Sequence, residues 1–461
     1  MVVVGAGISG LTTAFRLVRQ GLRVEVIEGA SRAGGVIGTE RSSGVLYERG
    51  PNSILDTSPL IGRLLGDLGI ASERLEMKAA CSKRYVVRNG VLVALPASPV
   101  AFLTTPLFST RAKLQLLREP FIARGSAHAE ETVAGFVTRR LGRELLDYAI
   151  EPFVAGIYAG DAAALSLAAA FPRLHALEQR YGSLIKGQIL GARRRSRAAE
   201  LSRHTAGSFS FPAGMQTLTD ALARAAGPVR TNARMSGVRR MDDATLLVSV
   251  ESGGGVTHLK ARAAVLAVPA YGAAPIVQPF APDAARALAE IPYAPVVSVA
   301  TAYARADVAH PLDGFGFLAP RVERRRILGT LFSSSMFEGR TPGNMVLATT
   351  FVGGQRDPER ASMPDHEIAR LTIEELASLI GATGSPPFCS VTRWPRAIPQ
   401  YTLGHLERIR RAQAAEAALP GLFLCGSYRD GVSVGDCIKS AHACADAVAD
   451  HVGRTHPAPA A

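Results

Sequence analysis

The feature that most constrains this chain is a glycine-rich turn at its start, between an apolar run and an amphipathic stretch. Residues 2–4 lead into Gly5-Ala6-Gly7-Ile8-Ser9-Gly10, and a second apolar run, 24–27, ends at Glu28. This order predicts strand, turn, helix and strand, the unit that binds a dinucleotide. Gly5 permits the tight turn, Gly7 lets the backbone approach a pyrophosphate, and Gly10 lets the helix pack closely on the strand. The helix N-terminus adds free N–H groups and a positive dipole.

Glu28 and the residues after it narrow the choice of ligand. The Glu28 carboxylate can accept hydrogen bonds from ribose hydroxyls and would repel a phosphate at the same place. Arg32-Ala33-Gly34-Gly35 follows and resembles the second fingerprint of flavoproteins of the amine oxidase type. That resemblance implies that Arg32 approaches a flavin nucleotide and that both glycines let the chain pass close to it. The alternative is an arginine on a surface turn.

Composition bounds the domain count and the compartment. A chain of 461 residues, of which 47% are hydrophobic, suggests two or three domains. The cysteines show no CxxC spacing, which favours reduced thiols and a cytoplasmic setting. The histidines are scattered, so we expect no metal site. We find no secretory signal and no apolar run of about 18 residues, so we expect no membrane span.

The charge balance favours anionic partners, because the formal net charge is +13. The densest basic run, residues 193–197, has no interleaved aromatic residues, and we expect no nucleic-acid binding. A solvated helix face and a membrane-facing patch both explain it. Residues 96–108 are apolar and broken by prolines, and the amphipathic stretch 111–118 follows. Apolar residues flanked by cations fit a segment in a bilayer interface, although a buried loop in a helical subdomain explains them too.

Periodicity predicts the layout of the rest. A helix is expected around residues 60–68, a mostly helical region from about 100 to 204, and strands at 246–250, 263–268, 296–303 and 345–351. A buried strand at 422–426 precedes a final helix. A second glycine-rich turn, 426–436, lies between these two elements, where a helix N-terminus would stabilise a group that gains negative charge. The N1 and C2 carbonyl edge of reduced flavin is such a group, and a purely structural turn is the alternative.

The segment Glu151-Pro152-Phe153-Val154-Ala155-Gly156-Ile157-Tyr158-Ala159-Gly160-Asp161 makes the resemblance specific. It is similar to the signature of protoporphyrinogen oxidases, oxygen-dependent flavoenzymes near the end of haem synthesis. The likeness runs nearly the full length, through 50–53, Arg84-Tyr85, 214–218, 314–317, 328–329, 394–401 and the C-terminal turn.

The resemblance implies an α/β fold with a Rossmann-like FAD-binding domain, an interleaved α+β substrate domain and a helical membrane-binding region. We expect the FAD-binding domain at 1–76, 205–262 and 388–461, the substrate domain at 77–99 and 263–387, and the helical region at 100–204.

Matched positions imply residue roles. Arg84 would pair with a substrate propionate, although a surface arginine in a strand explains it too, and Gly156, Leu318 and Phe337 would border the macrocycle. Met235 stands where the family often has a valine whose backbone meets the adenine. Cys437 is expected in the core, so the FAD is expected to be non-covalent. The residues expected to line FAD are Gly5, Ala6, Gly7, Ile8, Ser9, Gly10, Glu28, Gly29, Arg32, Gly34, Gly35, Gly50, Pro51, Asn52, Ser53, Met235, Trp394, Gly426, Val432, Ser433 and Val434.

The implied reaction converts protoporphyrinogen IX to protoporphyrin IX, with FAD as hydride acceptor and O₂ as terminal oxidant. Such a transfer needs position and an apolar slot more than an acid and base pair, so no general acid or base is assigned. The expected partners are the porphyrinogen, O₂ and an anionic membrane surface, with a homodimer and a transient contact with the next haem-pathway enzyme as further expectations. The expected location is cytoplasmic, peripheral on the inner face of the cell membrane.

Three alternatives stay open. A coproporphyrinogen III oxidase of the same family would use the same fold and flavin on a tetracarboxylate, and more cations around the slot would favour it. An amine or carotenoid oxidoreductase would share the FAD signatures without the 156–161 segment. A non-enzymatic lipid-binding relative of the fold would have lost the phosphate glycines and the ribose acid, which this chain keeps.

Overall fold

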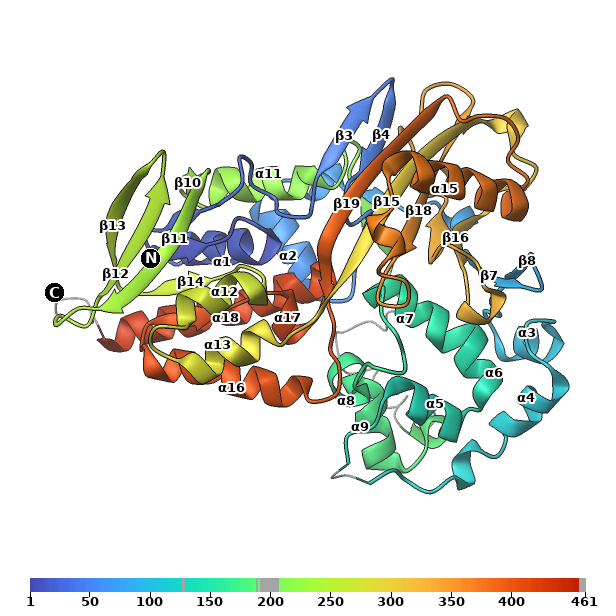
Figure 1. Cartoon of the computed structure of the whole chain (residues 1–461), viewed down its shortest axis with the longest axis horizontal. Coiled ribbons are helices and arrows are strands. Elements are labelled where there is room, and N and C mark those ends of the chain that lie inside the picture. The colour runs from blue at the N-terminus through green and yellow to red at the C-terminus, as the bar shows by residue number, and fades with distance from the viewer. Residues whose placement is uncertain (127–128, 188–189, 191–206, 456–461) are drawn as a thin grey trace.

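A parallel five-stranded sheet organises the first part of the molecule. The computed structural model describes residues 1–126, 129–187, 190 and 207–455. The sheet order is β10 (Val229–Arg230), β2 (Glu25–Ile27), β1 (Val2–Val4), β14 (Ala264–Leu266) and β20 (Leu422–Leu424). All four pairings are parallel. In Figure 1 this sheet lies in the left half of the view with the N- and C-termini.

Alternation along β1 explains how both faces of this sheet are covered. Val3 faces a core formed with α1 (Ile8–Arg19), α2 (Pro59–Asp67), α11 (Gln216–Ala225) and α18 (Val434–Thr455). Val2 and Val4 face the opposite core, which contains α12 (Ala270–Val277), α13 (Pro282–Ala289) and α16 (His405–Ala418). Successive strand residues point to opposite faces, so a continuous run of valines suits a parallel sheet buried on both sides.

A seven-stranded sheet forms the second part, at the upper right of Figure 1. Its order is β19 (Phe388–Pro399), β15 (Tyr293–Ala304), β18 (Met345–Gly353), β17 (Gly329–Leu331), β16 (Gly314–Leu318), β7 (Lys83–Arg88) and β8 (Val91–Ala94). Tyr85 and Val87 of β7 face α15 (Asp365–Ile380). Val86 faces the other way, into a cluster with Leu107, Phe108 and other residues of the helical region.

The helical region lies at the lower right of Figure 1. Its helices are α3 (Pro99–Thr104), α4 (Thr110–Leu116), α5 (Val133–Arg140), α6 (Arg143–Leu145), α7 (Glu151–Tyr158), α8 (Leu167–Ala170) and α9 (Pro172–Tyr181). A turn of π-helix at 146–150 leads into α7. The mostly helical character expected for residues 100–204 is seen where this range is described, whereas the basic run 193–197 lies outside the described residues.

Smaller strands complete the described fold. β11 (Ala233–Arg240), β12 (Leu246–Ser252) and β13 (Gly255–Ala261) form an antiparallel sheet beside the first one. β3 (Thr39–Ser42) pairs with β4 (Val45–Glu48). β9 (Ser208–Ser210) pairs with both β5 (Ile54–Leu55) and β6 (Leu75–Glu76).

Two strands fall on the other side of the expected domain boundaries. β14 was expected in the substrate domain, but it lies between β1 and β20 in the first sheet, and α12 and α13 after it pack on that sheet. β19 was expected in the FAD-binding domain, but it pairs along its length with β15. Both positions depend on pairing between strands remote in sequence, which periodicity does not reveal.

Candidate active site

The first glycine turn has the shape that a dinucleotide site needs. Gly5 has φ +103°, and a Cβ placed on Gly10 would lie 1.8 Å from the Gly5 carbonyl oxygen, so both positions require glycine. A Cβ on Gly7 would meet only Gly35 Cα, at 4.0 Å. No side chain caps the first turn of α1, where Gly7 is the N-cap residue. The free N–H groups at the N-terminus of α1 can therefore donate hydrogen bonds to an anion.

Glu28 lies beside this turn, at the end of β2. Its Oε2 accepts a hydrogen bond from Ala6 N at 2.7 Å, and its Oε1 accepts one from Ala30 N at 2.8 Å. An ionised carboxylate has further lone pairs for hydroxyl donors. The acid expected to contact a ribose is therefore held in a fixed orientation next to the glycine turn.

Arg32 stabilises the turn at residues 32–37, which follows Glu28. Its Nη1 donates to the carbonyl oxygens of Ala33 and Ile37, and its Nη2 donates to that of Gly35. Burial and the neighbouring Arg49 lower the pKa of Arg32. Two guanidinium groups in one partly buried place favour an anion between or beside them.

A chain of close contacts brings further expected cofactor residues around the same space. A Cβ on Gly50 would lie 2.2 Å from the carbonyl oxygen of Val36, directly after the Arg32 turn. Trp394 Nε1 donates to the Arg49 carbonyl oxygen at 2.7 Å. Asn52 donates to the Gly50 carbonyl oxygen, and Ser53 Oγ accepts from Ser208 Oγ. Residues 50–53 and Trp394 are thus assembled next to the turn at residues 32–37.

The second glycine turn joins this assembly through the start of α18. A Cβ on Gly435 would lie 3.5 Å from the Leu55 carbonyl oxygen, so β5 and the turn are in contact. Ser433 Oγ accepts from Asp436 N at 3.1 Å and donates to its carboxylate, which caps α18. Val432 and Val434 flank that cap, and Gly426 has φ +147° where β20 ends. The Ser433 side chain is therefore engaged by its own helix, and its carbonyl oxygen accepts from Cys437 N at 2.9 Å, so its N–H is the group left to contact a ligand.

Met235 and Gly29, both expected to line the cofactor, lie on neighbouring segments. Ala233 N donates to the Glu28 carbonyl oxygen, so β11 runs beside the acid. Met235 is 7% exposed and belongs to the core of the first sheet, so its backbone and not its side chain can contact a ligand. A Cβ on Gly29 would meet the Arg234 side chain at 3.2 Å. Cys437, also expected in the core, is buried.

Arg84 and Leu318, two of the residues expected to contact the substrate, lie on one face of the seven-stranded sheet. Arg84 is paired with Gly316 and Val86 with Leu318 in the register of β7 and β16, so all four side-chain positions share a face. α7 crosses this face, and a Cβ on Gly156 would lie 2.9 Å from Leu318 Cδ2. The structure therefore brings Gly156 and Leu318 together.

Arg84 has an unusual environment. It is half-buried, and its guanidinium carbon lies 5.4 Å from the centroid of the Phe315 ring. No carboxylate in residues 1–126, 129–187, 190 and 207–455 lies within ion-pair distance of it. Burial alone lowers the pKa of Arg84. A desolvated guanidinium of this kind gains from a carboxylate ligand.

Phe337 has a different position. It is 1% exposed and lies in a cluster with Cys81 and Met336, against which Phe315 of β16 and Leu331 of β17 pack. Phe337 packs in this cluster, and its expected contact with the macrocycle stays a prediction.

Phe351 was missed by the sequence reasoning. Leu318 pairs with Gly329, and Gly329 pairs with Phe351, so these three residues form one row across β16, β17 and β18. Phe351 is partly exposed and packs against the cluster that contains Ala155 of α7 and Ala159, the residue that follows this helix. The strand itself was predicted, but its inward face depends on register, which the sequence alone does not reveal.

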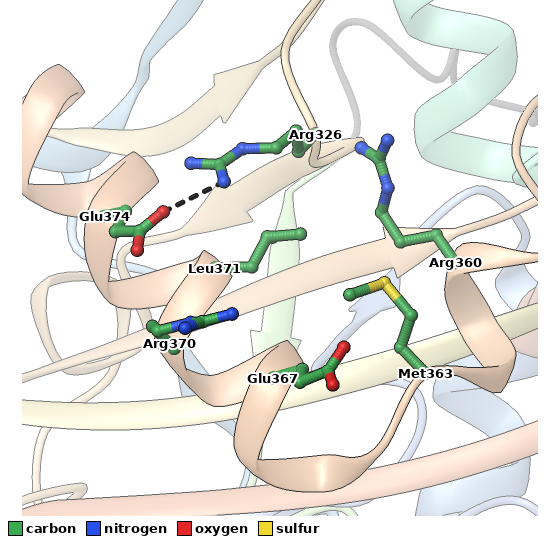
Figure 2. A pocket seen from close by; sticks show the side chains of 7 residues that line it. All are labelled: Arg326, Arg360, Met363, Glu367, Arg370, Leu371 and Glu374. Atoms are coloured by element: carbon green, nitrogen blue, oxygen red, sulfur yellow. Dashed lines mark hydrogen bonds and ion pairs between the residues drawn. The ribbon is translucent and has the colours of Figure 1, made fainter.

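A shallow pocket beside α15 is separate from this site (Figure 2). Arg326 and Arg360 line it, but they are paired with Glu374 and Asp357 at 2.9 Å each. α15 covers the opposite face of the seven-stranded sheet from Arg84 and Leu318. The remaining lining residues are Met363, Glu367, Arg370 and Leu371.

Comparison with known proteins decides the family. A family model described as flavin containing amine oxidoreductase matches residues 8–449. The chain belongs to this family. It is therefore a flavin-dependent oxidoreductase, and the expected family and Rossmann-like fold class are confirmed. The Gly5–Gly10 turn, with Gly35 beside Gly7, fits the flavin cofactor of this family.

Individual relatives cover nearly the whole chain. Protoporphyrinogen oxidase 2, chloroplastic/mitochondrial, of Arabidopsis thaliana is 34% identical over 98% of this chain and 94% of the relative. Coproporphyrinogen III oxidase of Propionibacterium freudenreichii subsp. freudenreichii is 32% identical over 98% and 90%. A solved structure from Exiguobacterium sp. 255-15 is 24% identical with a TM-score of 0.79, over 97% of this chain and 98% of that one. The last comparison supports the fold alone.

Proposed function

We propose that this flavoenzyme oxidises protoporphyrinogen IX to protoporphyrin IX, with non-covalent FAD as hydride acceptor and O₂ as terminal oxidant. The observation that carries the proposal is Arg84, a half-buried guanidinium on the sheet face that α7 crosses at Gly156. A planar guanidinium can bind a propionate through two parallel hydrogen bonds and fix which face of the ring is presented.

Bound FAD would supply the electron acceptor, and the chain's own residues would position both reactants. Gly5 to Gly10 and the α1 N-terminus would hold the diphosphate, Glu28 the ribose, and the 432–434 turn and Trp394 the flavin end. Leu318, Gly329 and Phe351 form an apolar row on the sheet face, and Gly156 of α7 packs against Leu318 in that row. An apolar slot excludes water and orients the ring carbon, so no side chain is needed as a general base.

Charge around the slot favours the dicarboxylate over the tetracarboxylate. Three other cations have carboxylate contacts: Lys83 contacts Asp313, Arg88 contacts Glu144 through Nη2 at 2.9 Å, and Arg356 contacts Glu151. The Arg84 guanidinium, without a carboxylate partner among the described residues, suits the propionate edge of protoporphyrinogen. Coproporphyrinogen III is the second candidate substrate. Two relatives named coproporphyrinogen III oxidase, 28% and 32% identical over 96% and 98% of this chain, support it.

We also place the enzyme at an anionic membrane surface, peripheral and on the cytoplasmic side. Five large apolar side chains between residues 100 and 121 are exposed, here called the apolar face: Val100 71%, Leu103 67%, Leu114 59%, Leu117 68% and Phe121 87%. Arg111 and Arg118 lie exposed beside them. Apolar anchors with neighbouring cations suit an interface with anionic lipid. None of the described helices is long and apolar enough to cross a bilayer.

Two measurements test this function. Flavin released by denaturation is identified by chromatography, and FAD is expected rather than FMN. The folded enzyme is then supplied with protoporphyrinogen IX in air, and porphyrin fluorescence is followed against a no-enzyme control. Catalysed fluorescence growth is expected, and a flavin-loaded enzyme that does not exceed the control would overturn the porphyrinogen assignment. Partners beyond these, including a homodimer and the next haem-pathway enzyme, remain expectations.

A further inference from the structure

Tyr401 lies at the junction between the two sheets and the helical region. It follows β19 by two residues and is 3% exposed. Its ring packs against Tyr158 at the end of α7, with centroids 5.7 Å apart, and stacks on His405 at 4.1 Å and 15°. Ser166 N donates to the Tyr401 carbonyl oxygen at 2.8 Å. The residue is therefore anchored by packing and backbone contacts on the helical side.

The Tyr401 hydroxyl reaches the second glycine turn. It accepts a hydrogen bond from Gly431 N at 2.8 Å and donates one to the Ser427 carbonyl oxygen. Ser427 begins the short helix α17 (Ser427–Asp430), and Gly431 follows its end. One oxygen atom thus joins both ends of α17, immediately before residues 432–434.

The geometry of Gly431 makes this bridge informative. Gly431 has φ +129°, and a Cβ there would lie 2.6 Å from Asp436 Cβ in the first turn of α18. The peptide at Gly431 therefore has little freedom on the α18 side. The Tyr401 hydroxyl fixes it on the other side.

Burial keeps this bridge in one protonation state. It raises the pKa of Tyr401 well above the ordinary phenol value, so the hydroxyl both donates and accepts at neutral pH. Burial also lowers the pKa of His405 to about 4, so the stacked ring is neutral there.

Gln400 extends the connection toward the substrate helix. Its side-chain amide donates to the Tyr158 carbonyl oxygen at 2.8 Å and to the Ile398 carbonyl oxygen at 3.0 Å. Tyr158 is the last residue of α7, which carries Gly156. The backbone at 400–401 is therefore tied to the helix that borders the substrate slot.

We infer that Tyr401 is a positioning residue whose hydroxyl holds residues 427–434 in the conformation that receives the flavin, and links that turn to α7. This inference rests on the proposed FAD site but not on the identity of the substrate. It extends the site to a residue that belongs to neither expected binding set.

The test compares Tyr401→Phe with Tyr303→Phe. Both substitutions remove one buried tyrosine hydroxyl, but Tyr303 Oη, in β15, has no hydrogen-bond partner among the residues that the structure describes. Apoprotein is prepared for each variant and titrated with FAD, with flavin fluorescence as the signal. Amide hydrogen exchange of residues 427–434 is measured on the apoprotein, and its thermal midpoint checks folding.

For Tyr401→Phe we expect FAD to bind about tenfold more weakly, the effect of one lost hydrogen bond that leaves a buried donor unsatisfied. Faster exchange at Gly431 should accompany it, with exchange in the seven-stranded sheet unchanged. Tyr303→Phe should match the parent protein in both. Equal FAD affinity and equal exchange in Tyr401→Phe would overturn the inference, as would a weaker affinity that merely follows global unfolding. A parent protein that binds no FAD would instead overturn the cofactor assignment and, with it, this inference.

Discussion

Gly156 on α7 and Leu318 on β16 are so close that a Cβ on the glycine would lie 2.9 Å from Leu318 Cδ2. Leu318 shares its sheet face with Arg84. Because α7 lies this close to β16, a larger residue at position 156 would have to displace either the helix or the Leu318 side chain.

Gly156→Val should therefore impair substrate use more than cofactor binding. Its branched side chain would push against Leu318 and narrow the apolar slot. We expect KM for the porphyrinogen to rise at least about tenfold, the equivalent of about 1.4 kcal/mol. FAD affinity should stay within twofold. Gly62→Ala is the control, because a Cβ there meets no atom within 4 Å. Unchanged KM in Gly156→Val would contradict the role of this contact.

Arg84→Met should weaken substrate binding while keeping the apolar stem that packs near Phe315. The lost charge-assisted hydrogen bonds correspond to about 1.5–3 kcal/mol, or roughly 10- to 150-fold in KM. Arg84→Lys should recover part of this loss, since an ammonium keeps the charge without the planar fork. Steady-state kinetics with flavin content as a check measures both. A KM equal to that of the parent enzyme for Arg84→Met would refute the propionate contact.

Gly7→Ala and Gly10→Ala should separate cofactor binding from folding. A Cβ on Gly10 would lie 1.8 Å from the Gly5 carbonyl oxygen, so Gly10→Ala should lower the thermal midpoint of the apoprotein. A Cβ on Gly7 has Gly35 Cα as its nearest atom, at 4.0 Å, so Gly7→Ala should keep that midpoint. It should nevertheless lose FAD, because the methyl group would stand where a pyrophosphate approaches. Normal FAD binding by Gly7→Ala would argue against a diphosphate at this turn.

The fully buried Arg140 should control the stability of the helical region. It is 0% exposed and pairs with Glu119 at 3.0 Å and Glu178 at 2.6 Å. Arg140→Met would leave two buried carboxylates without this partner, at a cost of about 3–5 kcal/mol in the free energy of unfolding. Urea titration measures it. A change below about 1 kcal/mol would mean that the network contributes little.

The same network predicts acid sensitivity. Burial alone would raise the pKa of Glu119 and Glu178, but hydrogen bonds from Ser183 and the arginines outweigh burial and lower both. A carboxylate with a lowered folded-state pKa stabilises the fold above its ordinary pKa of about 4.3, and this contribution is lost as the pH falls through the folded-state value. Unfolding free energy should decrease below about pH 4.3, with a smaller decrease in Glu119→Gln. Identical pH profiles would exclude Glu119 as a source.

Membrane contact should depend on the apolar face. Leu117→Ser and Phe121→Ser together should reduce binding to vesicles that contain anionic phosphatidylglycerol, because two exposed anchors are removed. Val256→Ser is the control, since Val256 is 55% exposed on β13, at the opposite end of the view from α3 and α4 in Figure 1. Co-sedimentation at two salt concentrations measures the effect. Equal loss in the control would indicate non-specific adsorption.

Sequence reasoning was most reliable where the structure is local. The first glycine turn, Glu28 and the final helix follow from spacing within about 30 residues, which reports directly on backbone geometry. The places of β14 and β19, the alignment of Phe351 with Leu318, and the bridge from Tyr401 to Gly431 depend on pairing between distant segments. Phe337 illustrates the same limit, because an aromatic side chain in a short apolar run gives no sign of whether it faces a slot or the core.

The most direct test of the central claim is the ratio of kcat/KM for protoporphyrinogen IX and coproporphyrinogen III, measured by porphyrin fluorescence in air on one preparation of FAD-loaded enzyme. The Arg84 guanidinium, which has no carboxylate partner among the described residues, and the apolar row from Leu318 to Phe351 predict a higher value for protoporphyrinogen IX. A higher kcat/KM for coproporphyrinogen III would contradict this account and show that the enzyme prefers this tetracarboxylate as its substrate.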